Sequence, residues 1–525
     1  MRRHPVIKSL FIFVLALAGS GCGERAAAWT APLQMLGPFE VADRVMWVDT
    51  TRGAVFAVDP NPSPPSVARV RIDPRATFAL PTPGRKKLLV LGAGQEALKK
   101  TQQSLSPGLT VIAVGAAGPI VEHFYPLSSP FDRVAVSPDE RLAIAYVSAG
   151  SGSGTALLRN PNELALIDLS AAPGDHNPVF RTIRSLGSAP LGIAFSPPLK
   201  IGADDPRTLA IVLSKNYLTF VDLDHRDRVE ITVPLQPIDA TGTVTPRQVV
   251  FASDGSAFVR ADGASDVFAI ALDPRPTSDP SQNDYHPRLN QPSAGKVVRD
   301  MLLYSDGGRT LLLTANDSQD LALVDAATSE FSIIPIGAPV DALIPLPKEN
   351  PTTVIVFSRG SPQPFVSLVT LKGLAQNGAR NVVRRTLARD AHDVVPIPGA
   401  TQALVVHDDA RTVFSILDLG PRRTDTPIEG RVPLHSFDFA GNFLVGVSPS
   451  VARIGILDLG DFSTRDFRLD QPPAQVLAVG GHVVVDHAAP EGLVTVLPDP
   501  RATRDEAHVL WGFFLSGLFE QELRD

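Results

Sequence analysis

The side chains best able to do chemistry gather in the last third of the chain, in three short runs of histidine and aspartate. Each run lies close to a predicted turn, and the runs are His392-Asp393, His407-Asp408-Asp409 and Asp486-His487. Imidazole and carboxylate groups together can bind a divalent metal or transfer protons. If the turns met at one mouth of a closed fold, His392, Asp393, His407, Asp409 and His487 would be the candidate ligands or base. The simpler interpretation, which we favour, is that they are solvated turn residues, so no catalytic or metal site is predicted.

Motifs typical of catalysis are missing from the rest of the sequence. There is no phosphate loop, dinucleotide-binding fingerprint, zincin helix or Gly-x-Ser-x-Gly elbow. The single cysteine, Cys22, excludes thiolate metal sites and haem attachment through a cysteine pair. Chemistry, if present, must come from loops that are distant in the sequence.

Cys22 stands directly after a leader with three parts. The first nine positions contain three basic residues, the run from Leu10 to Ala18 is wholly apolar, and Gly19-Ser20-Gly21 precede the cysteine. This is the layout of an export signal. The apolar run is about half the ~20 residues needed to span a bilayer, so it is predicted to be a cleaved signal segment and not a membrane helix.

The small residues before Cys22 resemble the lipobox of bacterial lipoproteins, in which the thiol is diacylglycerylated and the leader is removed just before it. Gly19 stands where that family prefers leucine. The resemblance implies a signal peptide over residues 1–21 and a lipidated tether over residues 22–38. Gly23 replaces the aspartate that retains enterobacterial lipoproteins in the inner membrane, which implies an outer-membrane anchor on either face. The alternative is an ordinary secretory signal with a coincidental cysteine.

The remainder of the chain has the composition of a water-soluble protein built from short strands. Hydrophobic residues make up 44% of the sequence, enough for a full core, and no apolar stretch after residue 22 approaches membrane-spanning length. The 40 glycines and 48 prolines are spread along the chain, which disfavours long helices. The 55 acidic residues outnumber the 48 basic ones. This balance argues against a nucleic-acid partner, because neutralising phosphates needs a basic surface.

One pattern recurs from residue 40 onward: an apolar strand, a polar turn, a second β-rich strand, a break, and a third strand ending in aspartate. Clear copies begin near Phe131, Leu191, Arg247 and Arg299. Alternate apolar residues place one face of each strand inward, and turns such as Ser305 to Gly308 supply residues that accept a positive φ. The closing strands indicate ten copies at spacings of about 39 to 55 residues, which matches a four-stranded propeller blade.

The repeats resemble those of bacterial propeller proteins of the YVTN and WD40-like kind. The resemblance implies an all-β fold, a β-propeller of about ten four-stranded blades over residues 39–508. We expect one closed ring; the alternative is two smaller rings, with Asp273 to Gly295 as the plausible hinge. Residues 509–525 are predicted to be a closing segment, whose apolar run Val509 to Leu515 pairs with the first blade and hides an open sheet edge.

Architecture without recognised chemistry favours binding over catalysis. The first hypothesis is a lipid-anchored cell-envelope propeller that acts as a non-catalytic protein-binding or scaffold module, with an envelope protein as partner and the lipid as its only membrane contact. The alternative is an exported hydrolase or lactonase with a metal-dependent loop site, since similar repeat propellers include such enzymes. Trp29, Trp47 and Trp511 do not follow the regular tryptophan pattern of quinoprotein blades, so no cofactor is expected.

Overall fold

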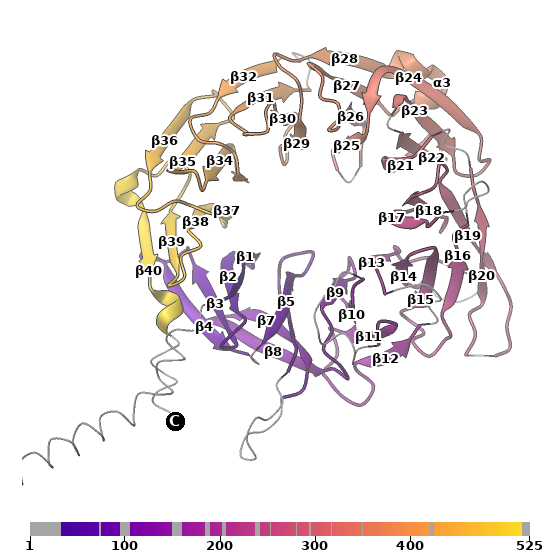
Figure 1. Ribbon diagram of the computed structural model, residues 1–525, viewed down its shortest axis with the longest axis horizontal. Helices are drawn as coiled ribbons and strands as arrows, with labels where there is room; N and C mark the ends of the chain where they lie inside the picture. Colours follow the sequence, from indigo (N-terminus) through magenta and orange to yellow (C-terminus); the bar gives the residue numbers. More distant parts are fainter. Residues whose placement is uncertain are drawn as a thin grey trace, which may run out of the picture.

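The computed structural model describes residues 33–72, 75–94, 105–149, 160–183, 189–201, 206–236, 242–252, 254–279, 281–292, 296–316, 318–348, 350–419 and 425–516. Within these ranges the chain forms ten four-stranded antiparallel sheets, arranged as blades around one ring (Figure 1). The chain passes once around the ring, from indigo in blade 1 to yellow in blade 10. The predicted all-β propeller is therefore confirmed, with one ring and not two.

Every blade is built from four strands that are consecutive in the sequence. Blades 1 to 3 contain β1 (Met35–Val41), β2 (Arg44–Asp49), β3 (Ala54–Asp59), β4 (Ser66–Arg71), β5 (Ala76–Pro81), β6 (Leu88–Gly92), β7 (Gly108–Gly115), β8 (Gly118–Pro126), β9 (Arg133–Val136), β10 (Leu142–Tyr146), β11 (Glu163–Asp168) and β12 (Val179–Thr182). Blades 4 to 6 contain β13 (Gly192–Phe195), β14 (Leu209–Ser214), β15 (Tyr217–Asp222), β16 (Ile231–Pro234), β17 (Thr245–Phe251), β18 (Ala257–Asp262), β19 (Phe268–Pro274), β20 (Tyr285–Asn290), β21 (Asp300–Asp306), β22 (Arg309–Ala315), β23 (Ser318–Asp325) and β24 (Phe331–Val340). Blades 7 and 8 contain β25 (Ala342–Leu346), β26 (Thr353–Phe357), β27 (Phe365–Thr370), β28 (Val382–Thr386), β29 (Asp393–Pro396), β30 (Gln402–Val406), β31 (Val413–Asp418) and β32 (Asp425–Glu429). Blades 9 and 10 contain β33 (Ser436–Ala440), β34 (Phe443–Ser448), β35 (Val451–Asp458), β36 (Thr464–Arg468), β37 (Gln475–Val479), β38 (His482–Asp486), β39 (Leu493–Leu497) and β40 (His508–Trp511).

Short helical turns complete the described part of the chain. They are α3 (Leu374–Asn377) and η2 (Gly378–Asn381) between β27 and β28, and η3 (Arg504–Glu506) and η4 (Phe513–Leu515) around β40. None of the helices in the described ranges has the length and apolar character needed to cross a membrane.

Both faces of a blade are buried, which explains the continuous apolar runs of the middle strands. In blade 6, Gly307 and Gly308 form the two-residue turn between β21 and β22, with φ of 57° and 81° that suit glycine. The register set by this turn directs Leu311 and Leu313 of β22 toward blade 7 and Leu312 toward blade 5. The sequence pattern predicted one inward face per strand; the ring gives the middle strands two.

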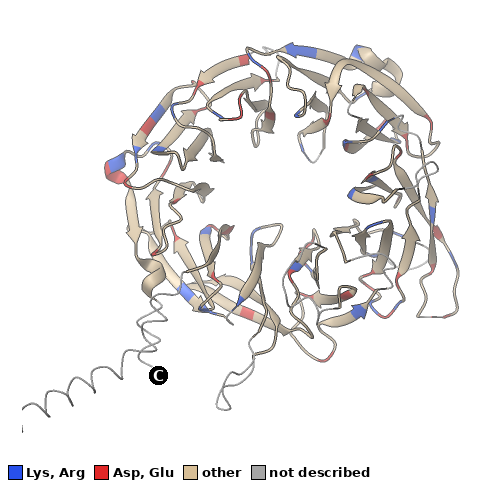
Figure 2. Ribbon diagram, in the orientation of Figure 1, with Lys and Arg blue, Asp and Glu red and all other residues tan. Residues whose placement is uncertain are grey.

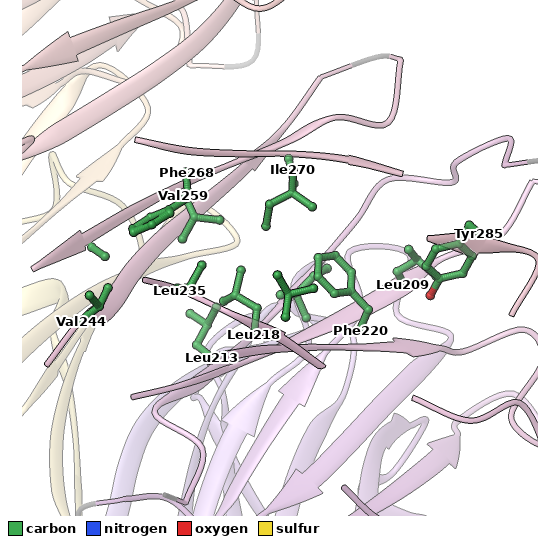
Figure 3. Close-up of a cluster of buried hydrophobic side chains, with 14 of the residues drawn as sticks. Leu209, Leu213, Leu218, Phe220, Leu235, Val244, Val259, Phe268, Ile270 and Tyr285 are labelled. Carbon is green, nitrogen blue, oxygen red and sulfur yellow. The ribbon is translucent and has the colours of Figure 1, made fainter. Parts of the chain in front are cut away.

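The core lies in layers between neighbouring blades. The largest layer packs blade 4 against blade 5, with Phe220 and Leu209 from one side and Phe268 and Ile270 from the other, all fully buried (Figure 3). Burying a side chain of this size stabilises the fold by about 1.5–3 kcal/mol relative to its exposure to water. Each blade is thus held by the two blades beside it.

The segment considered as a hinge belongs to blade 5 and is fastened to blade 4. It supplies the end of β19, a loop, and β20. The Val229 amide donates to the Ser281 carbonyl at 2.8 Å, and the Arg207 guanidinium pairs with Asp284 at 2.7 Å. Arg207 is itself fully buried beside Asp222. A loop held in this way is a blade insertion, which is the physical reason that the ring continues through it.

The ring closes where blade 10 meets blade 1. Strand β40 pairs with β39 of its own blade, so the segment after residue 508 adds its strand to the last blade and not to the first. Contact with blade 1 comes from η4, whose Phe513 lies 5.7 Å from Trp47 and whose Phe514 lies 5.2 Å from Phe56, between ring centroids. The closing contact is therefore a packing layer between complete blades, in which four aromatic rings stand among valines.

Candidate functional site

The innermost strand of each blade forms the inner wall of the ring (Figure 1). These strands are β1, β5, β9, β13, β17, β21, β25, β29, β33 and β37, and each is the edge strand of its sheet. An edge strand has a row of main-chain N–H and C=O groups that its own sheet does not pair. The inner wall therefore presents strand edges as well as side chains.

A hollow of about 680 Å³ lies along this wall over blades 3 to 7. Its lining is mostly apolar and consists of Pro138, Phe195, Pro197, Pro198, Gln248, Val249, Val250, Phe251, Asp300, Met301, Leu302, Leu303, Leu343 and Pro345. Its volume is within the range of about 300–1,000 Å³ that is usual for ligand sites. Phe195, Phe251 and Leu303 are only partly buried, so they offer apolar surface to a ligand.

A polar network crosses this hollow and joins three blades. The Arg260 Nε donates to Gln248 Oε1 at 3.3 Å, and Gln248 Nε2 donates to the Met301 carbonyl at 3.1 Å. Asp300 accepts from the amide of Met301 and, across to blade 7, from the amide of Leu343, each at 2.9 Å. The side chains of Gln248 and Asp300 thus tie the inner strands of blades 5, 6 and 7 together.

Burial sets the electrostatics of this network. It raises the pKa of Asp300, and the two main-chain donors and the positive charges of Arg260 and Arg359 offset this in part. Burial also lowers the pKa of Arg260, against the attraction of Asp300 and Asp262. Because both Asp300 oxygens accept main-chain hydrogen bonds, its carboxyl group positions the wall, and the apolar surface beside it can bind a ligand.

The structure brings together three of the five histidine and aspartate candidates, in blade 8. His392 Nδ1 lies 3.3 Å from Asp409 Oδ1, and the Asp409 side chain is 98% exposed. Asp393, the first residue of β29, accepts from the Arg359 Nε of blade 7 at 3.4 Å and lies 3.7 Å from Arg411. Asp409 is thus solvated and His392 is partly exposed, whereas Asp393 begins a strand and links two blades.

His407 and His487 are buried, at 5% and 9% exposure, and occupy equivalent positions in blades 8 and 10. The Nδ1 of His407 lies 2.9 Å from the Asp390 carbonyl, and its Nε2 lies 2.8 Å from the Ser415 hydroxyl. His487 repeats this arrangement with the Gln471 carbonyl at 3.1 Å and the Thr495 hydroxyl at 2.9 Å. Since a carbonyl oxygen only accepts, Nδ1 donates in both. Each imidazole fastens a blade to the linker before it.

Other predicted groups stand apart from this wall. Cys22 and its lipobox lie outside the described residues. In the part of the chain that the structure describes, no group of three His, Cys, Asp or Glu side chains is arranged to hold a metal ion. Charged residues of both signs are distributed around the ring instead of gathering in one sector (Figure 2).

Sequence reasoning missed the residues of the hollow. Gln248 and Asp300 lie in repeats beginning RQVVFASDG and RDMLLYSDG, which were interpreted only as strands and turns. A signal was present: in both repeats an arginine and then a polar residue stand directly before the apolar run of the inner strand. Asp393 begins a third inner strand. Gln248 and Asp300 link inner strands, and Asp393 bonds to Arg359 of the neighbouring blade.

Comparisons with known proteins concern the fold alone. No family model matches the chain, and no curated protein matches its sequence. A solved structure of the dihydro-heme d1 dehydrogenase NirN has a TM-score of 0.40 and 12% identity, covering 76% of this chain and 78% of that one. Apo AztD from Citrobacter koseri has a TM-score of 0.33 and 13% identity, with 74% and 96% covered. The Dos1 propeller has a TM-score of 0.38 and 11% identity, with 67% and 89% covered.

Proposed function

We propose that the protein is a non-catalytic binding module of the cell envelope, which takes an extended segment of a partner protein onto the inner wall of its ring. The observation that carries this proposal is the hollow of about 680 Å³ with its apolar lining. Partly buried Phe195, Phe251 and Leu303 supply contact area, and aromatic and aliphatic anchors of this kind dominate the affinity of interfaces.

An extended polypeptide fits the wall better than a compact partner does. Strands β13, β17, β21 and β25 all lie at sheet edges beside the hollow. A peptide in the extended conformation can pair with such an edge through its main chain and place alternate side chains in apolar pockets. The main-chain pairing would supply affinity, and Phe195 and Phe251 would select apolar side chains.

The proposed location is the outer membrane, through a lipid on Cys22. A chain of about 11 residues from Cys22 to Leu33 spans at most ~40 Å when extended, so the first blade would stay close to the membrane. Replacing Cys22 with Ala is expected to move the protein from the membrane fraction to the soluble periplasmic fraction. Retention of the variant in the membrane fraction would remove the anchor from the proposal and leave the binding site untouched.

Site-specific photocrosslinking in the native envelope tests the binding site. A photoreactive phenylalanine analogue at Phe251, on the inner wall, is expected to give a discrete crosslinked product. The matched control is the same analogue at Phe331, which is 48% exposed on the outer strand of blade 6. Val249→Arg, which places a charge in the lining, should abolish the Phe251 product. Equal products at Phe251 and Phe331, or a Phe251 product that survives Val249→Arg, would refute binding at the inner wall.

A further inference from the structure

A second hollow, of about 190 Å³, lies in the outer half of the ring between blades 9 and 10. Seven residues line it: Phe443, Ile456, Asp458, Ser463, Thr464, Arg465 and Arg501. Arg465 comes from β36, the outermost strand of blade 9, and Arg501 from the loop between β39 and β40 of blade 10. The two guanidinium-bearing residues thus reach the hollow from opposite blades.

Arginines near this hollow divide into paired and unpaired groups. Arg431 and Arg453 both pair with Asp466, and Arg504 pairs with Asp470 at 2.6 Å. Among the described residues, Arg465 and Arg501 form no ion pair with a carboxylate. The charges of Arg465 and Arg501 are thus not held by a direct carboxylate contact, although Asp499 and Glu506 lie near Arg465.

The hydrogen bonding of Arg465 is also incomplete. Its Nη1 donates to the main-chain carbonyl of Arg501 at 2.5 Å. Its Nη2 is buried and has no hydrogen-bond partner within the described ranges. A buried donor without an acceptor is costly, and in folded proteins it commonly marks a site for a water molecule or an ion. The guanidinium of Arg501 lies over the Phe443 ring, 5.1 Å from its centroid, which leaves its edge for a ligand.

The electrostatics favour a negatively charged ligand. Burial lowers the pKa of Arg465, and the neighbouring charge of Arg501 lowers it further, while Asp499 and Glu506 act in the opposite direction. One carboxylate, Asp458, lines the hollow, but its Oδ1 accepts from the Gly460 amide at 2.8 Å and from Asn442 at 3.1 Å. Asp458 therefore contributes one negative charge to the lining, against the two positive charges of Arg465 and Arg501.

We propose that this hollow binds a phosphoryl group through Arg465 and Arg501, with Ser463 and Thr464 at its wall. A guanidinium presents its donors as a planar fork that matches two oxygens of a phosphate, so two arginines can serve an anion with three or four oxygens. The volume of about 190 Å³ exceeds the need of a lone carboxylate and suits a phosphoryl group with a small attached residue. This site is independent of the inner-wall site.

Calorimetric titration of the purified full-length protein with inorganic phosphate, in a phosphate-free buffer of low ionic strength, tests the site. Wild-type protein is expected to give saturable heat, and Arg465→Gln and Arg501→Gln should each weaken binding about tenfold or more. Arg504→Gln is the matched control, because Arg504 already pairs with Asp470, and it should bind within about twofold of wild type. Thermal unfolding without phosphate confirms that each variant is folded.

The source of the phosphoryl group is separated by two further probes. If glycerol 3-phosphate binds more tightly than phosphate, the ligand is a phosphate monoester in solution. If the protein sediments with phosphatidylethanolamine vesicles only when they contain phosphatidic acid, the ligand is a lipid headgroup. The proposal is overturned if no saturable binding is found up to about 10 mM phosphate, or if folded Arg465→Gln binds as wild type does. An equal response to acetate would replace phosphate with a general carboxylate as the ligand.

Discussion

The seam between blades 10 and 1 and the interface between blades 4 and 5 solve the same packing problem with different side chains. The interface joins blades that follow each other in the chain and buries Phe220, Phe268 and Tyr285 among a larger number of aliphatic residues. The seam joins the two ends of the ring and concentrates aromatic rings, with Phe513 only 4.5 Å from Phe514 and both against blade 1. The two regions differ in one respect: a linker joins blade 4 to blade 5, and none joins blade 10 to blade 1.

The difference teaches where a closed ring needs its strongest contacts. Blades 4 and 5 stay near each other whatever packs between them, because a short linker joins them. The seam has no such linker, so its packing must also offset the entropy lost when distant parts of the chain are held together. Aromatic side chains bury about 150–250 Å² each, which is large for one residue. Packing therefore holds the two ends of the ring together where no linker does, through Trp47, Phe56, Phe513 and Phe514.

The largest effect is expected from removing the aromatic contact of the seam. Phe513→Ala combined with Phe514→Ala should lower the free energy of unfolding by about 5 kcal/mol, because each buried phenylalanine is worth about 3–5 kcal/mol and neighbours are not additive. Hydrogen exchange should show that β1–β4 and β37–β40 lose protection first. Phe268→Ala is the comparison within the chain-connected interface and should leave the protection of blades 1 and 10 unchanged. A uniform loss of protection in the double variant would contradict the special role of the seam.

The second prediction concerns the buried ion pair beside the interface between blades 4 and 5, a kind of contact that the aromatic cluster of the seam does not contain. Asp222→Asn removes the charge that faces Arg207, and both side chains are fully buried. Loss of one partner of a buried ion pair costs about 3–5 kcal/mol when the other charge is left alone. Because Asp284 still pairs with Arg207 at 2.7 Å, chemical denaturation should show a smaller fall in the free energy of unfolding, of up to about 3 kcal/mol. Asp273→Asn, whose partner Arg288 is exposed, should leave it nearly unchanged. Equal effects of the two substitutions would show that the buried pair adds nothing to the interface.

A third test uses the pH dependence of blade 10. Burial raises the pKa of Asp486 to about 6, above the ordinary 3.8, so its contribution to stability is complete below pH 3.8 and is lost as the pH rises to about 6. Asp486→Asn should therefore raise the free energy of unfolding at pH 7 by up to about 3 kcal/mol, with the gain vanishing near pH 4. Denaturation midpoints across this pH range measure it, and a gain that does not depend on pH would contradict it.

The neighbouring His487 acts in the opposite direction. Burial lowers the pKa of His487 below 6.5, so the unfolded chain binds a proton more readily and stability falls as the pH drops below 6.5. His487→Gln is the matched variant. It should reduce the loss of unfolding free energy as the pH falls below 6.5, whereas Asp486→Asn should increase that loss.

The smallest effect is expected from Trp511, and it tests where the seam ends. Trp511 is 69% exposed at the end of β40, two residues before the buried Phe513. Trp511→Ser should change the free energy of unfolding by less than about 0.5 kcal/mol, because surface substitutions away from buried contacts have little effect. A thermal unfolding curve measures this. A loss as large as that of the phenylalanine variants would place part of the seam at Trp511.

Local sequence patterns predicted the blades well, because blades are local structures. The turn at Gly307 and Gly308, the apolar middle strands and the closing aspartates all lie within one repeat. Counting repeats therefore gave a ring of ten. The pairing of β40 was harder, because the apolar run after residue 508 is compatible with either neighbouring blade.

The inner-wall site depended on what the ring brings together. Phe195, Asp300 and Pro345 are far apart in the sequence, and only the curvature of the ring places them in one hollow. His407 and His487 follow directly after strands, where the sequence indicates turns. Their imidazoles fold back onto their own blades, because Ser415 of β31 and Thr495 of β39 offer hydroxyl partners there. Sequence spacing does not reveal such partners.

The arrangement of four consecutive strands in every blade, with neither end of the chain lending a strand to the other, has an evolutionary consequence. Each blade is a complete exchangeable unit, because β1–β4 and β37–β40 are whole sheets. An in-frame duplication or deletion of one repeat would leave every strand paired within its own blade. The size of such a ring can therefore change by single steps of gene duplication, provided that the seam between the first and last blades is preserved.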